Sequence, residues 1–204
     1  MKHYISVNGQ TRELTEDQAK RILEQIDKET PKVQLGEIEP GKTFRIGNHE
    51  FIVLEHVAGD TAVIRRDILR ECLFGKTNNF VGSDAELVCK KFANELAEII
   101  GEENIAEHNM DLTSNDGLKD YGVIRTRCSM LTADLYRRYV DILDEYKPKS
   151  WWWLATPFST KRHESEKYVI CVSPAGYVSN DRCNDDGIGV RPFCILKSTI
   201  FVSK

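Results

Sequence analysis

The chain has 204 residues, with 28 lysine and arginine side chains against 32 aspartate and glutamate side chains, so its formal net charge is −4. A chain of this length with 41% hydrophobic residues can bury a large core without disulfides or a structural metal. The slight excess of acidic over basic side chains argues against binding to nucleic acid or to an anionic membrane, since both require a basic face.

The first 30 residues are expected to form a small appendage, with residues 31–204 as the main domain. Residues 3–7 alternate as in a strand, Asn8-Gly9 is typical of a two-residue hairpin turn, and residues 10–14 can return as a second strand. The start of the chain lacks the apolar core of a secretory signal, so a cytoplasmic location is expected.

A helix is predicted directly after this hairpin. Thr15 and Gln18 have the spacing of a capping box. Apolar residues then recur at helical spacing, at Ala19, Ile22, Leu23 and Ile26. A hairpin with one helix is too small to be stable by itself, so the appendage is expected to dock on the main domain or to form a homo-oligomer.

Short strands and one strong helix are predicted in the first part of the main domain. The strands are expected as an antiparallel meander over residues 43–46, 50–57 and 61–65. Ser83 and Glu86 form a second capping box, and the helix that they begin ends at Gly101. A third helix is expected to follow Thr132 and to stop before Pro148.

After Pro148 the sequence predicts short strands separated by long polar loops. Strands and helices thus occur in separate blocks, which indicates an α+β fold rather than alternating βαβ units. No run of apolar residues reaches the roughly 18 needed for a membrane span, so no membrane partner is expected.

The acidic charge is concentrated in one region. Residues 84–107 carry seven acidic side chains against Lys90 and Lys91, a local charge of −5. A solvated helix face explains this pattern, and an acidic docking surface for a basic partner is the alternative.

The sequence lacks the familiar catalytic and metal-binding motifs. No H-E-x-x-H, G-x-S-x-G, Walker P-loop or G-x-G-x-x-G occurs. His49 and His56 lie seven apart on a predicted strand, on opposite faces, which is a poor arrangement for a metal pair. The six cysteines show no C-x-x-C spacing and are expected to be free thiols. No cofactor or metal is therefore predicted, although a spatial Cys–His dyad stays open.

The acidic loop at residues 180–187 was compared with a calcium-binding loop, because clustered carboxylates and amides are ligands that calcium prefers. If Gly187 takes the invariant glycine position of an EF-hand, Arg182 and Phe193 occupy two ligand positions. Both residues are incompatible with that motif. An exposed turn is favoured, and a calcium site of another geometry is the alternative.

Three consecutive tryptophans are the most unusual feature. On a strand, Trp151 and Trp153 share one face and Trp152 points the opposite way. The simplest interpretation is two core side chains with the third in a second layer, and the alternative is that one indole lines a binding surface.

Three sequence blocks carry a resemblance to a known family: Trp151–Pro157 (WWWLATP), Val172–Val178 (VSPAGYV) and Gly189–Phe193 (GVRPF). They resemble an uncharacterised domain family of gut bacteria and their phages, which reads W-W-L-x-[ST]-P and then G-V-R-P. That family is similar to the C-type-lectin-like group, which includes formylglycine-generating enzymes and the tropism-determining variable proteins of phages. The resemblance implies a C-type-lectin-like fold over about residues 36–204, with Arg191 serving the fold through a buried hydrogen bond.

The motifs of the catalytic and sugar-binding members are missing. Cys171, Cys183 and Cys194 are too widely spaced for the close copper-binding pair of the enzymes, and neither clustered histidines nor a Glu-Pro-Asn type calcium motif occurs. The resemblance therefore implies a platform for display loops, at residues 158–167 and 179–188.

Together these observations predict a non-enzymatic protein of phage or prophage origin that binds a protein or small ligand through its C-terminal loops. The alternatives are a metal- or thiol-dependent enzyme and a structural or assembly subunit of a phage particle, which would be virion-associated. The predicted ligand-binding residues are Trp152, Tyr177, Asn180, Asp181, Arg182, Asn184 and Asp185.

Overall fold

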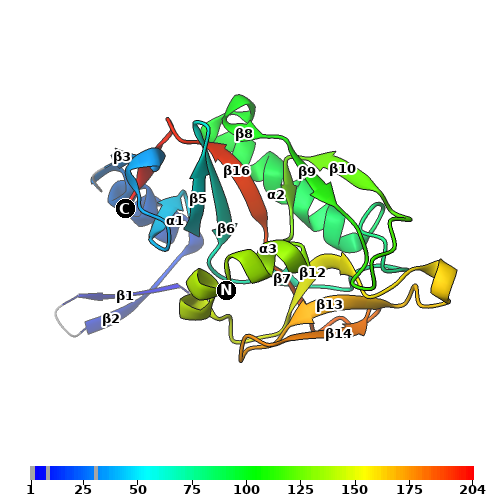
Figure 1. Cartoon of the computed structure of the whole chain (residues 1–204). Coiled ribbons are helices and arrows are strands. Elements are labelled where there is room, and N and C mark those ends of the chain that lie inside the picture. The colour runs from blue at the N-terminus through cyan, green and yellow to red at the C-terminus, as the bar shows by residue number, and fades with distance from the viewer. Residues whose placement is uncertain (1–2, 8–9, 30–31) are drawn as a thin grey trace.

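The computed structural model describes residues 3–7, 10–29 and 32–204 (Figure 1). Its helices are α1 (Glu16–Glu29), α2 (Asp84–Ile100), α3 (Ala133–Arg138) and α4 (Val140–Leu143). The strands before α2 are β1 (His3–Val7), β2 (Gln10–Leu14), β3 (Lys32–Gln34), β4 (Thr43–Ile46), β5 (His49–Val57), β6 (Asp60–Arg65) and β7 (Arg70–Glu71). Those after α2 are β8 (Ile105–Ala106), β9 (His108–Asp111), β10 (Val123–Thr126), β11 (Cys128–Ser129), β12 (Trp152–Pro157), β13 (Tyr168–Val172), β14 (Val178–Arg182), β15 (Gly189–Val190), β16 (Phe193–Lys197) and β17 (Phe201–Ser203).

Within the described residues, the strands form two large sheets and two small hairpins. The first large sheet has the order β11-β16-β6-β5-β4-β17-β3, with β8 also pairing with β16. It contains the predicted meander, because β4, β5 and β6 pair antiparallel in chain order. The second large sheet has the order β14-β13-β12-β15-β7. Strands β16 and β17, near the C-terminus, therefore flank the meander, with β16 paired to β6 and β17 paired to β4.

The expected fold class, an α+β domain of the C-type-lectin-like type, is wrong. Strands make up 37% of the structure and helices 24%, so the fold is β-rich, with two curled sheets and few helices. Part of the difference comes from two-residue strands such as β7, β11 and β15, which pair with segments distant in sequence. Strands this short carry no alternation that a sequence pattern can show.

The capping signals predict the helix starts correctly. The hydroxyl oxygen of Ser83 accepts a hydrogen bond from the Glu86 amide at 3.0 Å, and Gly101 ends α2 with φ of 87°. Thr132 caps the third helix in the same way, accepting from the Leu135 amide at 3.3 Å. That helix is interrupted at Tyr139, where φ is −107° and ψ is 14°, so α3 and α4 replace the single helix that was expected.

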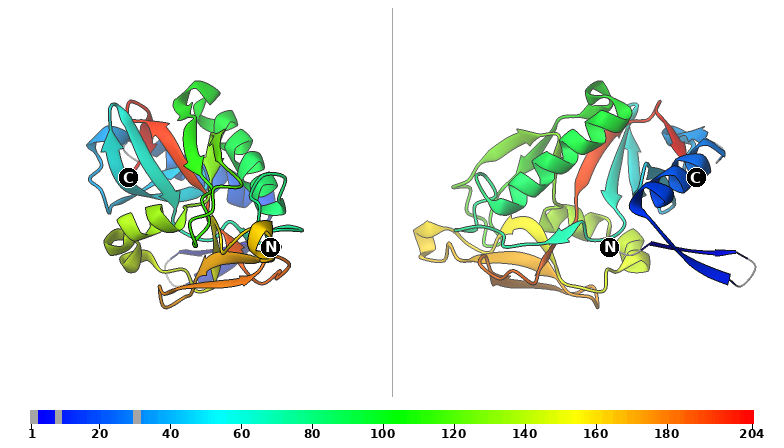
Figure 2. Two further views of the ribbon diagram at one scale, coloured as in Figure 1. Left: turned by 45° about the vertical axis from the view of Figure 1, so that its right-hand side comes forward. Right: turned by 180° about the vertical axis from the view of Figure 1, so that it is seen from behind.

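Helices lie on both sides of the meander sheet, and both faces of its strands β5 and β6 are largely buried. On one side, α2 packs over side chains such as Phe51 and Val53 (Figure 2, right). On the other, α3 and α4 pack with Ile52 and Leu54, which point the opposite way along β5. Two hydrophobic clusters result instead of the single core that one covered face would give.

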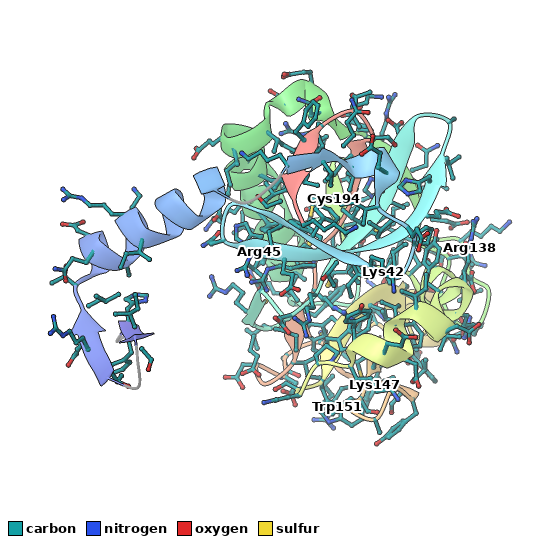
Figure 3. The ribbon with its side chains drawn as sticks, turned by 90° about the vertical axis from the view of Figure 1, so that its left-hand side faces the viewer. Lys42, Arg45, Arg138, Lys147, Trp151 and Cys194 are labelled. Atoms are coloured by element: carbon teal, nitrogen blue, oxygen red, sulfur yellow. The ribbon has the colours of Figure 1, made fainter. Side chains whose placement is uncertain are left out.

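The appendage lies to one side of the main body (Figure 3). The hairpin β1–β2 pairs antiparallel from His3↔Leu14 to Val7↔Gln10, and α1 contacts both strands. The Thr15–Gln18 capping box is confirmed, with both reciprocal hydrogen bonds present, and Ala19 is buried. The Asn8-Gly9 turn and the boundary between residues 30 and 31 lie outside the described residues. No helix in the described part of the chain is long and apolar enough to cross a membrane.

Candidate functional site

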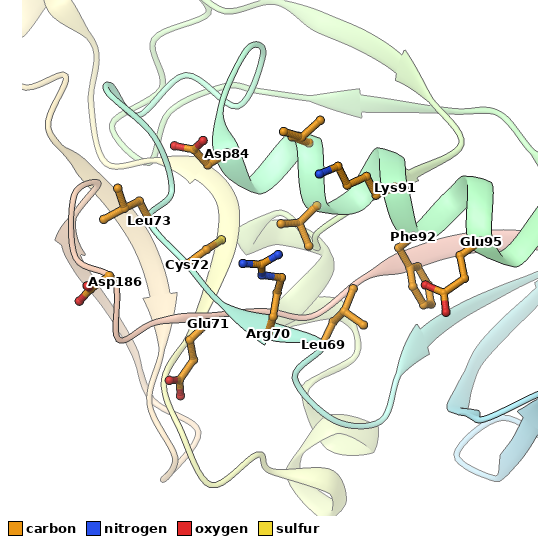
Figure 4. Close-up of a pocket in the computed structure, with 12 residues that line it drawn as sticks. Leu69, Arg70, Glu71, Cys72, Leu73, Asp84, Lys91, Phe92, Glu95 and Asp186 are labelled. Carbon is orange, nitrogen blue, oxygen red and sulfur yellow. The ribbon is translucent and has the colours of Figure 1, made fainter. Parts of the chain in front are cut away.

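A groove of about 680 Å³ lies between helix α2 and the segment formed by residues 69–73, which includes strand β7 (Figure 4). We call it the α2–β7 groove. Its lining residues are Leu69, Arg70, Glu71, Cys72, Leu73, Asp84, Leu87, Val88, Lys91, Phe92, Glu95 and Asp186. The volume is in the range of protein ligand sites, which is about 300–1,000 Å³.

Strand β7 borders the groove because it is the outermost strand of its sheet. It pairs antiparallel with β15, and the Leu69 amide donates to the Val190 carbonyl at 2.8 Å. Gly189 permits this close approach, since a Cβ atom there would lie 2.4 Å from the Ile68 side chain. Among the described residues β7 has a strand partner on one side alone, so its other edge is unpaired.

The groove combines an apolar floor with exposed apolar walls. Val88 and Phe92 are buried in the core beneath it. Leu73 and Leu87 are 39% and 49% exposed and lie on its two walls. Exposed apolar surface of this kind, rimmed by polar residues, is typical of a binding site.

The charged side chains around the groove are largely uncompensated. Glu95 accepts a hydrogen bond from His49 Nε2 at 3.0 Å. The others form no ion pair with any described residue, and they are Arg70, Glu71, Asp84, Lys91 and Asp186. Free charges of both signs beside an apolar floor can be paired by a ligand.

Cys72 is the nucleophile candidate in the groove, and its environment does not activate it. Burial raises the pKa of its thiol, with nearby Arg70 acting weakly in the opposite direction. No histidine is among the residues that line the described groove. The Cys72 carbonyl accepts from Trp153 Nε1 at 3.1 Å, which fixes the backbone here. The groove therefore has the features of a binding site rather than those of a thiol active site.

The other thiols lie in the core. Cys128 and Cys194 are direct partners on β11 and β16. Burial, with hydrogen bonds to Cys194 and Cys89, raises the pKa of Cys128 well above its usual value. Burial also raises the pKa of Cys171 to about 12. Sequence spacing missed the Cys128–Cys194 proximity, because 66 positions separate the two residues.

A serine, a histidine and an aspartate meet near the first predicted display loop. Ser159 Oγ donates to Asp116 Oδ2 at 2.6 Å, and His163 Nδ1 lies 2.9 Å from the same oxygen. In a hydrolase triad, the serine and the aspartate contact opposite nitrogens of the imidazole ring. Here both approach Nδ1, so His163 is not placed to take a proton from Ser159 at one ring nitrogen while Asp116 holds the other. Hydrogen bonds from Ser114 and Ser159 hold the pKa of Asp116 well below its usual range.

The predicted ligand-binding residues occupy three different environments. Trp152 is 1% exposed, against Tyr136 in the core, so a ligand at the surface would not reach it. Tyr177 is 58% exposed and contacts Trp151 edge to face at 5.5 Å between ring centroids. Residues 180–182 lie on strand β14 instead of in a loop, and this edge strand carries Asn180, Asp181 and Arg182.

The remaining two predicted ligand-binding residues lie in the turn after β14. Asn184 and Asp185 are exposed there, and the next residue, Asp186, lines the α2–β7 groove. No group of three or more histidine, cysteine, aspartate or glutamate side chains in residues 3–7, 10–29 and 32–204 is arranged to hold a metal ion. An exposed turn stays the favoured interpretation here, with a calcium site of another geometry as the alternative.

Arg191 serves the fold, as expected. Its side chain is fully buried, Nε donates to the Arg65 carbonyl at 2.8 Å and Nη2 donates to the Tyr146 carbonyl at 3.2 Å. The guanidinium stacks on Trp152, 5.1 Å from the ring centroid. Burial lowers the pKa of Arg191 to about 10, so it stays charged at neutral pH.

His108 gives the protein a predictable sensitivity to acid. It is buried, its Nε2 lies 3.0 Å from Ser129 Oγ, and burial lowers its pKa to about 4. In the unfolded chain the His108 imidazole takes up a proton near pH ~6.5, whereas in the folded protein it does so only near pH 4. The contribution of His108 to the free energy of unfolding is therefore complete above pH ~6.5 and is lost as the pH falls toward 4. We expect the free energy of unfolding to fall by about 2 kcal/mol between pH 7 and pH 5 from this group.

Urea unfolding of the wild-type protein and of His108→Gln at both pH values measures this effect. The variant should be less stable at pH 7 and should show a smaller loss on acidification. An identical loss in both proteins would assign the pH dependence to other groups, such as His49, whose pKa burial also lowers.

Residues 78–198 match a family model described as a domain of unknown function (DUF6273), and this range is more than half of the chain. The chain belongs to the DUF6273 family. The DUF6273 range includes α2 and Asp186, whereas β7 precedes it, so the groove is built by the DUF6273 part together with the segment before it. No curated protein and no solved structure matches the chain at a significant level.

Sequence reasoning missed most of the groove. The acidic region at residues 84–107 contains Asp84 and Glu95, and an acidic docking surface was an alternative there. The signals that could have found the groove are exposed apolar positions on an otherwise amphipathic helix, at Leu87 beside Lys91. The facing segment 69–73 gave no signal, since its place beside α2 depends on pairing with β15.

Proposed function

We propose that this protein is a non-enzymatic binding protein that takes an extended peptide segment of a partner protein into the α2–β7 groove. The observation that carries the proposal is an open strand edge, on β7, beside an apolar groove with unpaired charges. An extended peptide can pair its backbone with such an edge while its alternate side chains enter the groove.

The groove favours a peptide over a compact metabolite. It is open along its length, and its exposed leucines, Leu73 and Leu87, come from opposite walls. An added strand would cover both while satisfying backbone groups of β7, and covering the remaining exposed part of each leucine contributes about 1 kcal/mol. Main-chain hydrogen bonds would supply affinity, and the pockets between the leucines would supply selectivity.

The enzyme alternative gains no support at this groove, because burial raises the pKa of the Cys72 thiol. The phage or prophage origin, the assembly role, the homo-oligomer through residues 1–30 and the resemblance to the C-type-lectin-like group stay predictions, as does the location.

A matched pair of substitutions on α2 tests the proposal. Leu87 and Ile99 are 49% and 48% exposed, and Leu87 alone of the two lines the groove. Peptides are first selected against the wild-type protein from a library of random nine-residue sequences displayed on a carrier. We then expect Leu87→Glu to weaken binding of the selected peptides at least tenfold, because a carboxylate would replace the apolar side chain of the α2 wall, and Ile99→Glu to leave it within about twofold.

Fluorescence anisotropy with labelled peptides gives the dissociation constants, and circular dichroism confirms that both variants are folded. Recovery of no binding peptide, or equal weakening by Leu87→Glu and Ile99→Glu, would refute the groove as the binding site.

A second candidate surface is the exposed face of the edge strand β14, which carries three of the residues proposed from the sequence for ligand binding, Asn180, Asp181 and Arg182. Tyr177 projects beside it, and Val178, Asn180 and Arg182 alternate on one exposed face. Combined substitution of Asn180, Arg182 and Asp185 by alanine serves as the test of this surface in the same assay. Peptides that lose binding to this variant and keep it to Leu87→Glu would identify β14 as the binding face.

A further inference from the structure

The charges of the α2–β7 groove are separated along its length. The segment 69–73 and helix α2 run in opposite directions, so Leu73 lies beside Asp84 at one end and Leu69 lies toward Glu95 at the other (Figure 4). Asp186 lies at the same end as Leu73. One end of the groove is therefore acidic.

The other half of the groove presents cations. Arg70 points toward α2, and Lys91 lies on the facing wall beyond the middle of the groove (Figure 4). Glu71 points away from α2, and Glu95 accepts a hydrogen bond from His49, so this half carries one anion beside its two cations. Neither Arg70 nor Lys91 makes an ion pair with a described residue, so both can take an anionic group of a ligand.

The spacing between the two charged ends suits a strand. Asp84 and Lys91 are seven residues apart on α2, which is about 10.5 Å along the helix axis. Three to four residues of an extended chain cover this distance at roughly 3.3 Å per residue. Side chains four positions apart lie on one face of a strand, with the residue midway between them on the same face, opposite Leu87.

The direction of the occupant follows from the open edge of β7. Strand β7 runs from the basic half of the groove toward the acidic end. An antiparallel partner, the commoner arrangement, therefore enters at the acidic end and leaves at the basic one. Resting on the proposed peptide-binding function, we infer that the occupant is an extended segment in which a lysine or arginine precedes an aspartate or glutamate by four residues, with an apolar residue midway.

Two peptides of identical composition test the order of the charges. The probes are fluorescein-labelled acetyl-TKTITET-amide and acetyl-TETITKT-amide, each held on a tetravalent carrier so that weak binding is measurable. We expect the first to bind the wild-type protein about tenfold more tightly, because both of its charges meet opposite charges and both charges of the second meet like ones.

A charge-exchanged protein provides the reciprocal test. The quadruple variant Asp84→Lys, Asp186→Lys, Arg70→Glu, Lys91→Glu keeps the formal net charge of −4 while exchanging the charges of the two ends. It should prefer acetyl-TETITKT-amide, so the ratio of the two dissociation constants reverses. Loss of affinity for both peptides without reversal would show that the charges act non-specifically and would overturn the inference.

The outcome also separates this inference from the proposed function. If peptides selected from the random library lose binding to Leu87→Glu but show no basic-before-acidic order, the groove binds peptides and the charge order is wrong. If no selected peptide is sensitive to Leu87→Glu, the proposed function itself fails.

Discussion

Substitution of Trp153 or Trp152 by alanine is expected to lower the free energy of unfolding by about 4 kcal/mol each, whereas Trp151→Ala should cost about 1 kcal/mol. Trp153 is fully buried in the cluster under α2, edge to face with Phe74 at 5.8 Å. Trp152 is buried in the opposite cluster against Tyr136. Trp151 is only partly buried. Removing an indole from either core leaves a large cavity that neighbours fill only in part.

Phenylalanine substitutions separate the packing of the indoles from their hydrogen bonds. Trp153 Nε1 donates to the Cys72 carbonyl, whereas Trp152 Nε1 has no hydrogen-bond partner among the described residues. Trp153→Phe should therefore be the more costly of the two phenylalanine variants, since it leaves that carbonyl unpaired. Urea unfolding followed by circular dichroism gives the free energies. A cost for Trp152→Ala as small as that for Trp151→Ala would contradict its place in the second cluster.

The tryptophans show what alternation can and cannot predict. Period-two spacing placed Trp152 opposite Trp153, and the two do lie in different clusters. This spacing carries no information on whether helices cover both faces of the strand, so the sequence alone leaves Trp152 as a candidate for ligand binding. That depends on α3 and α4 packing against β12, a contact between distant segments.

Local signals predicted local structure well. Ser83 marks the start of α2 and Gly101 marks its end, because a helix cap is decided by a few neighbouring residues. The fold class was wrong for the opposite reason: β7 and β15 are strands only through each other and through β12. The groove could not be predicted for the same reason, since one of its walls is β7 and β7 exists only through its pairing with β15.

Exposed residues were the harder part of the site. Leu87 sits on a helix whose buried face is strongly apolar, and an additional exposed leucine there looks unremarkable in sequence. Asp186 was noticed within an acidic turn, but its place beside Asp84 depends on the return of the chain into β15. A binding surface assembled from three separate segments has no local pattern by which it could be found.

Asn78→Ala is expected to lower the free energy of unfolding by about 4 kcal/mol, although the residue lies in a loop. Asn78 is fully buried, and its Nδ2 donates to the carbonyls of Ser159, Ser165 and Tyr168 at 2.8, 3.1 and 2.9 Å. Its Oδ1 accepts from the Tyr121 hydroxyl at 2.8 Å. One side chain thus joins the loop before α2 to the segment between β12 and β13, and alanine leaves several buried polar groups without a partner.

The neighbouring residue is the matched control. Asn79 is less buried and its Oδ1 accepts one hydrogen bond, from the Val81 amide at 3.0 Å, so Asn79→Ala should cost about 1 kcal/mol. Tyr121→Phe removes only the hydroxyl from the Asn78 network and should cost a similar amount. Urea unfolding measures the free energy of unfolding of each variant. If the dependence of this free energy on urea concentration is the same as in the wild-type protein, the difference between the two is a difference in stability. If Asn78→Ala costs no more than Asn79→Ala, the two loops are held together by their apolar contacts, and the amide network contributes little.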